Sequence, residues 1–250
     1  MASVVQRHDN AQRAFGSLFE GIRDDMAKVE ELLRAQLRSA DPYVDQLVKH
    51  GFRLGGKRLR PALLLLAASA VGAIGSAHIT LAVVMEMIHT ATLIHDDVLD
   101  EASLRRHLDT VNARWGNKSG VLLGDFLFSH AFFLAATTDD AYACRLIGRS
   151  TNIVCEGEMR QINSRGRLDL SEAEYYEIIN AKTAELCACC CRLGGHYAGA
   201  SPEHEEALDS YGRNLGMAFQ VVDDLLDLEG DESLTGKSLG TDLEQLKPTL

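Results

Sequence analysis

The chain has 250 residues and a net charge of −11, with 25 Lys and Arg against 36 Asp and Glu. This length suffices for one large domain with a substantial core, and a hydrophobic content of 46% argues against disorder. A strongly acidic chain is a poor partner for nucleic acid, so an anionic substrate would need a local basic patch or metal ions.

Apolar residues recur at three- and four-residue spacing along nearly the whole chain, which predicts an all-α protein with a single domain over residues 1–250. Ser171 and Glu174 have the spacing of a capping box, and Pro61 suits the first turn of a helix. No stretch alternates as a β-strand would, and the polar tail is expected to be a loop. The predicted helices cover residues 11–38, 42–50, 61–72, 78–98, 118–138, 139–163, 171–195 and 202–228.

From Pro61 to Met85 the sequence contains no charged residue, a length that raises the question of a membrane-spanning helix. The polar, Gly-containing stretch 71–80 instead predicts a turn between two core helices, each too short to span, and therefore no transmembrane segment. The N-terminus lacks the apolar core of a signal peptide, which predicts a cytoplasmic protein with reduced thiols. The cluster Cys187, Cys189, Cys190 and Cys191 lacks paired C-x-x-C motifs and nearby His, so a packing role is expected.

Two acidic motifs each end an apolar helix. The stretch 90–107, TATLIHDDVLDEASLRRH, brings Asp96 and Asp100 onto one helix face, where like charges repel. The second motif, FQVVDDLLD, contains Asp223, Asp224 and Asp227. Hard oxygen ligands without nearby His or Cys indicate Mg²⁺, and two such motifs across a bundle would bind a diphosphate through several ions.

Basic residues close to these motifs, or close to glycines that break the chain, are candidates for contacts with the phosphate oxygens. A single Lys or Arg is more often an exposed surface charge, so placement is what distinguishes this subset. Its members are Lys57, Arg58, Arg60, Arg105, Arg106, Lys182, Lys237 and Lys247.

Taken together, these motifs resemble the trans (all-E) polyprenyl diphosphate synthases. GGKRLRP, HTATLIHDDVLDEASLRR, GDFLFSHAF, Lys182-Thr183, FQVVDDLLD and GKSLGTDLEQLKPT occur in that family's order, from about residue 15 to the end. The resemblance implies an all-α bundle around a deep central cavity, the isoprenoid synthase fold, usually as a homodimer. It also implies further C-terminal helices, so the chain is expected to be truncated after Leu250.

The same resemblance implies a reaction, the Mg²⁺-dependent condensation of isopentenyl diphosphate with an allylic diphosphate, and a role for each matched residue. The metal ligands on the allylic diphosphate would be Asp96, Asp100, Asp223 and Asp227, with Asp224 also in the catalytic set. The same diphosphate would be contacted by Arg105, Lys182 and Lys237, and Lys247 is a further candidate for substrate binding. Isopentenyl diphosphate would be bound by Lys57, Arg60, His89 and Arg106, while Thr183 and Gln220 flank the reacting carbons.

Product length is expected to depend on the helix that carries Asp96. Thr92 lies four residues before Asp96, and one helical turn of about 5.4 Å is comparable to one isoprene unit. In the family that this chain resembles, aromatic residues at the positions of Ala91 and Thr92 stop growth of the product. Here both residues are small, and Met85, deeper on the same face, is flexible. This predicts a long-chain product of octaprenyl or solanesyl type, about C30 to C50, delivered at the membrane surface. Alternatively, Ala91 is small only so that a neighbouring helix can pack closely.

Three other functions are compatible with parts of this pattern. A short-chain synthase making products of about C15 to C20 would share every motif. A terpene cyclase shares the bundle and an acidic motif, but the loop GGKRLRP and Arg106 would then lack a second diphosphate to bind. A non-catalytic regulatory subunit is expected to lose acidic ligands, and here both motifs are intact.

Overall fold

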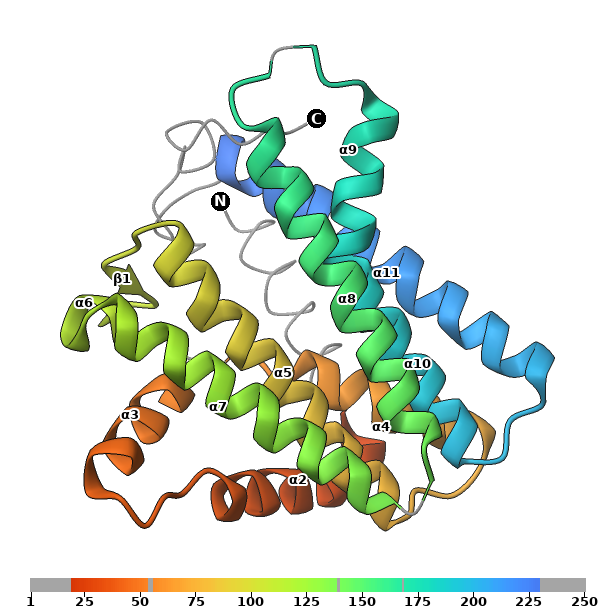
Figure 1. Cartoon of the computed structure of the whole chain (residues 1–250). Helices are drawn as coiled ribbons and strands as arrows, with labels where there is room; N and C mark the ends of the chain where they lie inside the picture. The colour runs from red at the N-terminus through yellow and green to blue at the C-terminus, as the bar shows by residue number, and fades with distance from the viewer. Residues whose placement is uncertain (1–18, 54–55, 139, 168, 230–250) are drawn as a thin grey trace, which may run out of the picture.

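Residues 19–53, 56–138, 140–167 and 169–229 are described by the computed structural model, and helices account for most of them (Figure 1). The all-α prediction is therefore confirmed, with most helix ends within a few residues of those expected. The expected helix start at residue 11 and the expected loop after residue 229 lie outside the described residues. The elements are η1 (Glu20–Ile22), α2 (Arg23–Gln36), α3 (Pro42–Arg53), α4 (Leu59–Val71), α5 (Ser76–Leu99), β1 (Leu104–Arg105), β2 (Leu108–Asp109), α6 (Val111–Trp115), α7 (Asn117–Ala135), η2 (Ala136–Thr138), α8 (Tyr142–Ser164), α9 (Glu172–Ile179), η3 (Asn180–Ala184), α10 (Glu185–Tyr197) and α11 (Pro202–Glu229).

The core is built around α5, which packs against α7, α4, α2 and α10. All residues of α5 from Leu81 to Ile88 are buried, because helices cover this part of α5 on several sides. Helices α4 and α10 approach so closely that a Cβ at Gly194 would collide with the carbonyl oxygen of Leu64. The four clustered cysteines of α10 are buried in this core, which confirms their packing role.

Two of the described helical segments, Ser76–Leu99 and Asn117–Thr138, are long and apolar enough to cross a membrane by length and composition. The expectation that the first would be too short to span is therefore wrong, since α5 has 24 residues. Within the fold, 67% of its most apolar window is buried against neighbouring helices, and this burial accounts for its composition.

Two local features depart from the predicted elements. The helix expected over 171–195 is interrupted by η3, a π-helical turn, which the continuous apolar pattern did not reveal. A two-stranded antiparallel hairpin, β1 with β2, pairs Leu104 with Asp109 just after the first acidic motif. Its turn residues Arg106 and His107 have φ of 51° and 63°, and such turns usually contain Asn or Gly.

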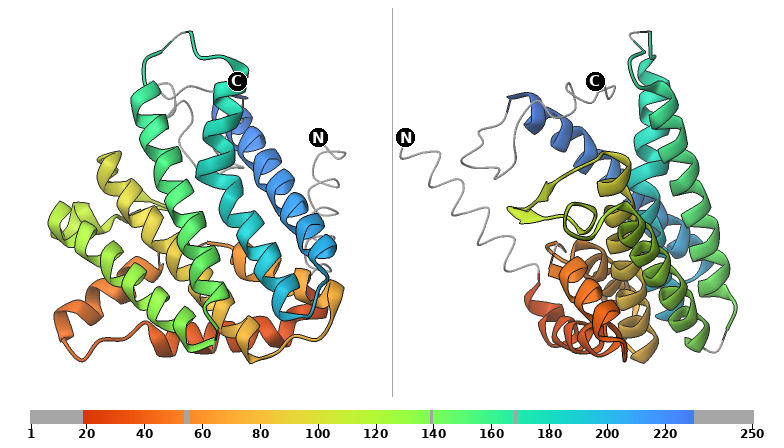
Figure 2. Two further views of the ribbon diagram at one scale, coloured as in Figure 1. Left: turned by 45° about the vertical axis from the view of Figure 1, so that its right-hand side comes forward. Right: turned by 60° about the vertical axis from the view of Figure 1, so that its left-hand side comes forward.

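The ends of the helices determine where chemistry can take place. The C-terminal ends of α5, α8 and α11 lie at one end of the bundle, whereas α2 and α3 lie near the other (Figure 2). The ends of α5 and α11 carry the two predicted acidic motifs, whereas no predicted site residue lies on α8. The fold therefore gathers segments that are far apart in the sequence at one end of the molecule.

Candidate active site

The first acidic motif forms the last turn of α5, and its central residue anchors the hairpin that follows. Asp97 is buried and accepts a hydrogen bond of 2.8 Å from Nε of Arg105 on β1. Its backbone carbonyl accepts from Nδ2 of Asn112, which also donates to the carbonyl of Ala102. Asp97 thus holds Arg105 beside the motif, a role for which the sequence offered no signal beyond proximity.

Asp96 and Asp100 lie where α5, α8 and η3 meet. Burial raises the pKa of Asp96 to about 6, an effect that Lys182 opposes and that Glu158 and Asp100 reinforce. Lys182 on η3 forms an ion pair of 2.5 Å with Glu158 on α8. Asp100 accepts a hydrogen bond of 2.6 Å from Nη2 of Arg165, the C-cap residue of α8. The site therefore combines several carboxylates with cations contributed by other elements.

The second acidic motif lies on α11, on the other side of η3. Asp224 is buried and accepts hydrogen bonds from the Tyr175 hydroxyl at 2.6 Å and from Nε2 of Gln220 at 2.7 Å. Gln220 in turn accepts a hydrogen bond of 2.9 Å from the Thr183 hydroxyl. These contacts give Asp224 the task of orienting the Gln220 amide, while Asp223 and Asp227 on the same helix remain partly exposed.

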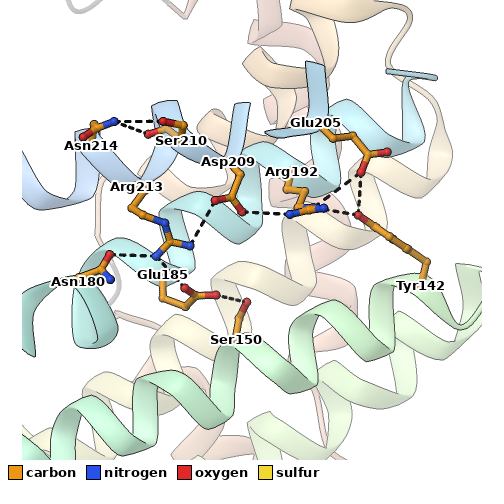
Figure 3. A network of polar contacts seen from close by, with 10 residues as sticks. All are labelled: Tyr142, Ser150, Asn180, Glu185, Arg192, Glu205, Asp209, Ser210, Arg213 and Asn214. Carbon is orange, nitrogen blue, oxygen red and sulfur yellow. Dashed lines mark hydrogen bonds and ion pairs between the residues drawn. The ribbon is translucent and has the colours of Figure 1, made fainter. Parts of the chain in front are cut away.

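The π-helical turn η3 connects the two acidic motifs. Its neighbouring residues Lys182 and Thr183 reach in different directions, Lys182 toward the Asp96 region and Thr183 toward α11. Arg213 on α11 holds both ends of this turn, donating to Asn180 at 2.9 Å and pairing with Glu185 at 3.0 Å (Figure 3). An inserted residue in a helix changes the direction of its side chains, which explains why π-turns often occur at functional sites.

A cluster of basic side chains surrounds His89. Burial, and then the charges of Arg60, Arg105, Arg106 and Arg58, lower the pKa of His89 well below its ordinary value. A Cβ at Gly56 would lie 2.7 Å from Nη2 of Arg106, so the glycine loop and the hairpin are in contact. Clustered positive charges repel one another, and a bound anion would relieve this repulsion. The cluster around His89 is therefore suited to bind a second diphosphate.

Arg58, the N-cap residue of α4, and Arg60 in its first turn differ in their partners. Arg58 pairs with Glu30 at 2.6 Å and with the buried Glu86 at 2.7 Å, so its charge is neutralised within the fold. Arg60, by contrast, has a buried Nε without a hydrogen-bond partner among the described residues. Lys57 is exposed beside them, and the predicted residues Lys237 and Lys247 lie outside the described residues.

Magnesium fits the chemistry of the first motif. Within the described ranges, no three or more His, Cys, Asp or Glu side chains already form a group that could hold a metal. The donors present are nevertheless carboxylate oxygens, and a bound divalent cation would favour the ionised form of Asp96, whose pKa is raised chiefly by burial. Asp97 Oδ2 is also buried without a partner among the described residues.

The three residues predicted to set product length lie on α5. Ala91 and Met85 are fully buried, and the Thr92 hydroxyl donates to the carbonyl of His89. A small, mostly apolar pocket with no room for a water molecule lies beside α5. It is lined by Leu37, Val48, Phe52, Met87, Thr90 and Leu127.

Comparison with known proteins gives the same assignment as the geometry. Residues 41–250 match the sequence profile of the polyprenyl synthetase family. The octaprenyl diphosphate synthase of Escherichia coli K12 is 42% identical over 226 residues, which cover 90% of this chain and 70% of that protein. A crystal structure of a decaprenyl diphosphate synthase from Rhodobacter capsulatus superposes with a TM-score of 0.88 at 40% identity, covering 94% of this chain and 72% of the other.

A crystal structure of a polyprenyl synthase from Caulobacter crescentus, complexed with calcium and isoprenyl diphosphate, has a TM-score of 0.89 and 42% identity. The match covers 93% of this chain and 71% of that one. The fold is that of the isoprenoid synthases, which are all-helical enzymes. The chain belongs to the polyprenyl synthetase family. It is a prenyltransferase that condenses isopentenyl diphosphate with an allylic diphosphate.

Proposed function

We propose that this prenyltransferase is Mg²⁺-dependent and makes a long-chain all-trans polyprenyl diphosphate of about C30 to C50. The observation that carries the proposal is the position of η3 between two acidic helix ends, with a separate arginine cluster around His89. This arrangement offers one site for a metal-bound diphosphate and another for a diphosphate held by side chains alone. A terpene cyclase would have no use for the second site.

On the allylic side, Asp96 and Asp100 would hold Mg²⁺ together with Asp223 and Asp227. Bound Mg²⁺ would stabilise the charge that develops on the departing diphosphate. Lys182 lies close enough to Asp96 to lower its pKa, and Arg105 is held beside the motif by Asp97. Both cations are therefore suited to contact the same diphosphate, and Lys237 and Lys247 are proposed to join them.

On the other side, Lys57, Arg60, His89 and Arg106 would bind isopentenyl diphosphate. The lowered pKa of His89 leaves its imidazole neutral near pH 7, so it can donate one hydrogen bond without adding to the charge of the arginines. The Gln220 amide, fixed between Thr183 and Asp224, would face the reacting carbons. The departing diphosphate would accept the proton lost in the final step, so no further base is required.

A long product is supported by the small residues Ala91 and Thr92 on the α5 helix, one turn before Asp96. The similarity to octaprenyl and decaprenyl diphosphate synthases points in the same direction. The prenyl product would grow away from the acidic motifs toward Met85. We propose that the finished product is delivered from the cytoplasm to a membrane surface.

A homodimer is supported by the exposed side of α7, where Val121, Leu122 and Phe133 are 42%, 67% and 64% exposed. Isolated apolar side chains on a surface are common, but three on one helix favour an interface with a second copy. Sedimentation of wild type and of a Leu122→Glu/Phe133→Glu variant would test this, with the variant expected to be monomeric.

Incorporation of labelled isopentenyl diphosphate onto an allylic primer tests the proposed clamp. Asp96→Ala and Asp223→Ala should each lower turnover by orders of magnitude in Mg²⁺ while leaving the fold intact. Asp25→Ala, which removes a carboxylate paired with the exposed Lys28, is the matched control and should keep wild-type turnover. Near-normal turnover of Asp96→Ala would refute the metal assignment, and no incorporation by wild type would favour a regulatory subunit.

A further inference from the structure

Arg165, the C-cap residue of α8, is a cation of the site that no motif singled out. Its Nη2 donates to Oδ1 of Asp100 over 2.6 Å, and the two side chains are only 27% and 16% exposed. Solvent therefore screens this pair weakly. The Nε of Arg165 is buried and has no hydrogen-bond partner in the described part of the chain. A buried donor without an acceptor is costly, and such a donor is well suited to an acceptor supplied by a ligand.

The pair belongs to a wider pattern around Asp96. Lys182 on η3 pairs with Glu158, and Arg105 on β1 pairs with Asp97, at 2.5 and 2.8 Å. Arg165 and Asp100 form the third pair. Three cations from three different elements are thus each bound to a carboxylate of the site. A cation that binds these carboxylates, or an anion that binds these basic groups, must first break ion pairs.

We propose that Arg165 is a further diphosphate-binding residue that changes partners when substrate arrives. When Asp100 binds Mg²⁺, the Arg165 guanidinium turns to a phosphate oxygen of the allylic diphosphate. The planar guanidinium presents several donors in a rigid fork, so Nε and Nη2 can serve phosphate oxygens together. This inference rests on the proposed function, because it assumes that the first motif binds a metal-bound diphosphate.

The exchange has a thermodynamic consequence that can be measured. Mg²⁺ alone must displace Arg165 from Asp100, and a diphosphate alone meets cations that are already paired. Each ligand removes the obstacle to the other, so the two should bind with positive coupling. Removing the Arg165 guanidinium should therefore affect the two ligands in opposite directions.

Titration calorimetry of the whole protein, with Mg²⁺ alone and with inorganic pyrophosphate at saturating Mg²⁺, provides the test. For Arg165→Met we expect Mg²⁺ alone to bind about 5-fold more tightly and pyrophosphate about 10-fold more weakly, the loss of one charge-assisted contact. Damage to the fold would weaken both ligands, so opposite signs are specific to the exchange.

Two further variants make the result decisive. Arg167→Met is the matched control, because Arg167 lies in the same loop but pairs with Asp169 and Glu174 at the surface. Arg167→Met should leave both affinities unchanged. Arg165→Lys should bind Mg²⁺ with the wild-type affinity and should recover only part of the wild-type affinity for pyrophosphate. The proposal is overturned if Arg165→Met behaves like Arg167→Met or weakens both ligands. If wild type itself fails to bind pyrophosphate with Mg²⁺, the proposed function fails as well.

Discussion

Asp96 is a site carboxylate whose ionised form is disfavoured by its surroundings. It is largely removed from solvent, and Glu158 and Asp100 add repulsion that Lys182 only partly offsets. Burial of an ionised carboxylate favours the protonated form, so the pKa of about 6 measures a cost that the folded chain bears near neutral pH. The ionised carboxylate of Asp96 is the form that would bind Mg²⁺, and the same form lowers the stability of the folded protein.

This cost predicts a pH-dependent gain in stability for Asp96→Asn. The folded pKa lies above the ordinary value of 3.8, so the ionised carboxylate destabilises the folded state fully above pH 6 and hardly at all below pH 4. In EDTA at pH 8, Asp96→Asn should raise the free energy of unfolding by about 2 kcal/mol. Urea titrations between pH 4.5 and 8 should show the gain shrinking as the pH falls.

The control for this titration is Asp45, a partly exposed carboxylate whose pKa is shifted in the opposite direction. A hydrogen bond from Lys49 lowers the pKa of Asp45, so its charge favours the folded state. Asp45→Asn should therefore show no stabilisation at pH 8. Equal stability of Asp96→Asn and wild type across the whole range would contradict the burial of this charge.

Gly56 shows how one missing side chain shapes the second diphosphate site. An added Cβ would lie 2.7 Å from Nη2 and 3.1 Å from Nη1 of Arg106, the far end of a flexible side chain. Gly56→Ala should therefore displace the guanidinium while changing the free energy of unfolding by less than about 0.5 kcal/mol.

The expected kinetic result is a roughly 3- to 10-fold higher KM for isopentenyl diphosphate, with the KM of the primer unchanged. Gly21→Ala, where an added Cβ meets nothing within 4 Å, is the matched control. A rise confined to the primer would assign Arg106 to the other diphosphate.

At the scale of elements, η3 and the polar network behind it determine the site. Arg213 connects Asn180 and Glu185, the residues at either side of Lys182 and Thr183, and also contacts Asp209 (Figure 3). Glu185 is buried and accepts a further hydrogen bond of 2.8 Å from Ser150 on α8. The network fixes the π-turn against two helices, and so fixes the direction of Lys182.

Removing one charge of the Arg213–Glu185 pair should destabilise the protein more than replacing both charged residues by apolar ones. Arg213→Met leaves Glu185 buried with one neutral partner, and should cost about 2–3 kcal/mol of unfolding free energy. The double variant Glu185→Leu/Arg213→Met removes both charges and should recover part of that loss. Urea melts of the three proteins measure the coupling, and strictly additive losses would show that the pair does not act as a unit.

The sequence predicted most helices because burial imposes a regular apolar period, but it could not reveal η3. A π-turn adds one residue without interrupting the apolar pattern, so residues 171–195 look like one helix. The hairpin was missed because two-residue strands carry no alternation. Its turn uses Arg106 and His107 at positive φ instead of Asn or Gly.

The arrangement of the candidate site could be predicted only in part, for a related reason. The motifs singled out Asp96, Asp100, His89 and the arginines after the glycines as candidates, yet they could not separate Arg58 from Arg60. The partners of Arg58 are Glu30 and Glu86, each 28 residues away, and only the fold brings them together. Arg165 lacked any motif, since its role depends on where α8 ends.

At the scale of the whole molecule, the growing product must find space inside a bundle whose core is well packed. Ala91 is fully buried, so Ala91→Phe either blocks the path of the product or overpacks the core. The first outcome shortens the product to about C15 to C20 with the melting temperature little changed, whereas the second lowers the melting temperature. Chromatography of the products beside a thermal melt separates the two, and an unchanged product distribution would refute the tunnel assignment.

The most direct test of the central claim is the mass spectrum of the products that wild type makes from isopentenyl diphosphate and an allylic primer. With Mg²⁺ present, we predict all-trans polyprenyl diphosphates of about C30 to C50, and none when EDTA removes the metal. Products that end at about C15 to C20 would contradict the long-chain assignment. Elongation that continues in EDTA would contradict the metal-bound diphosphate on which the account depends.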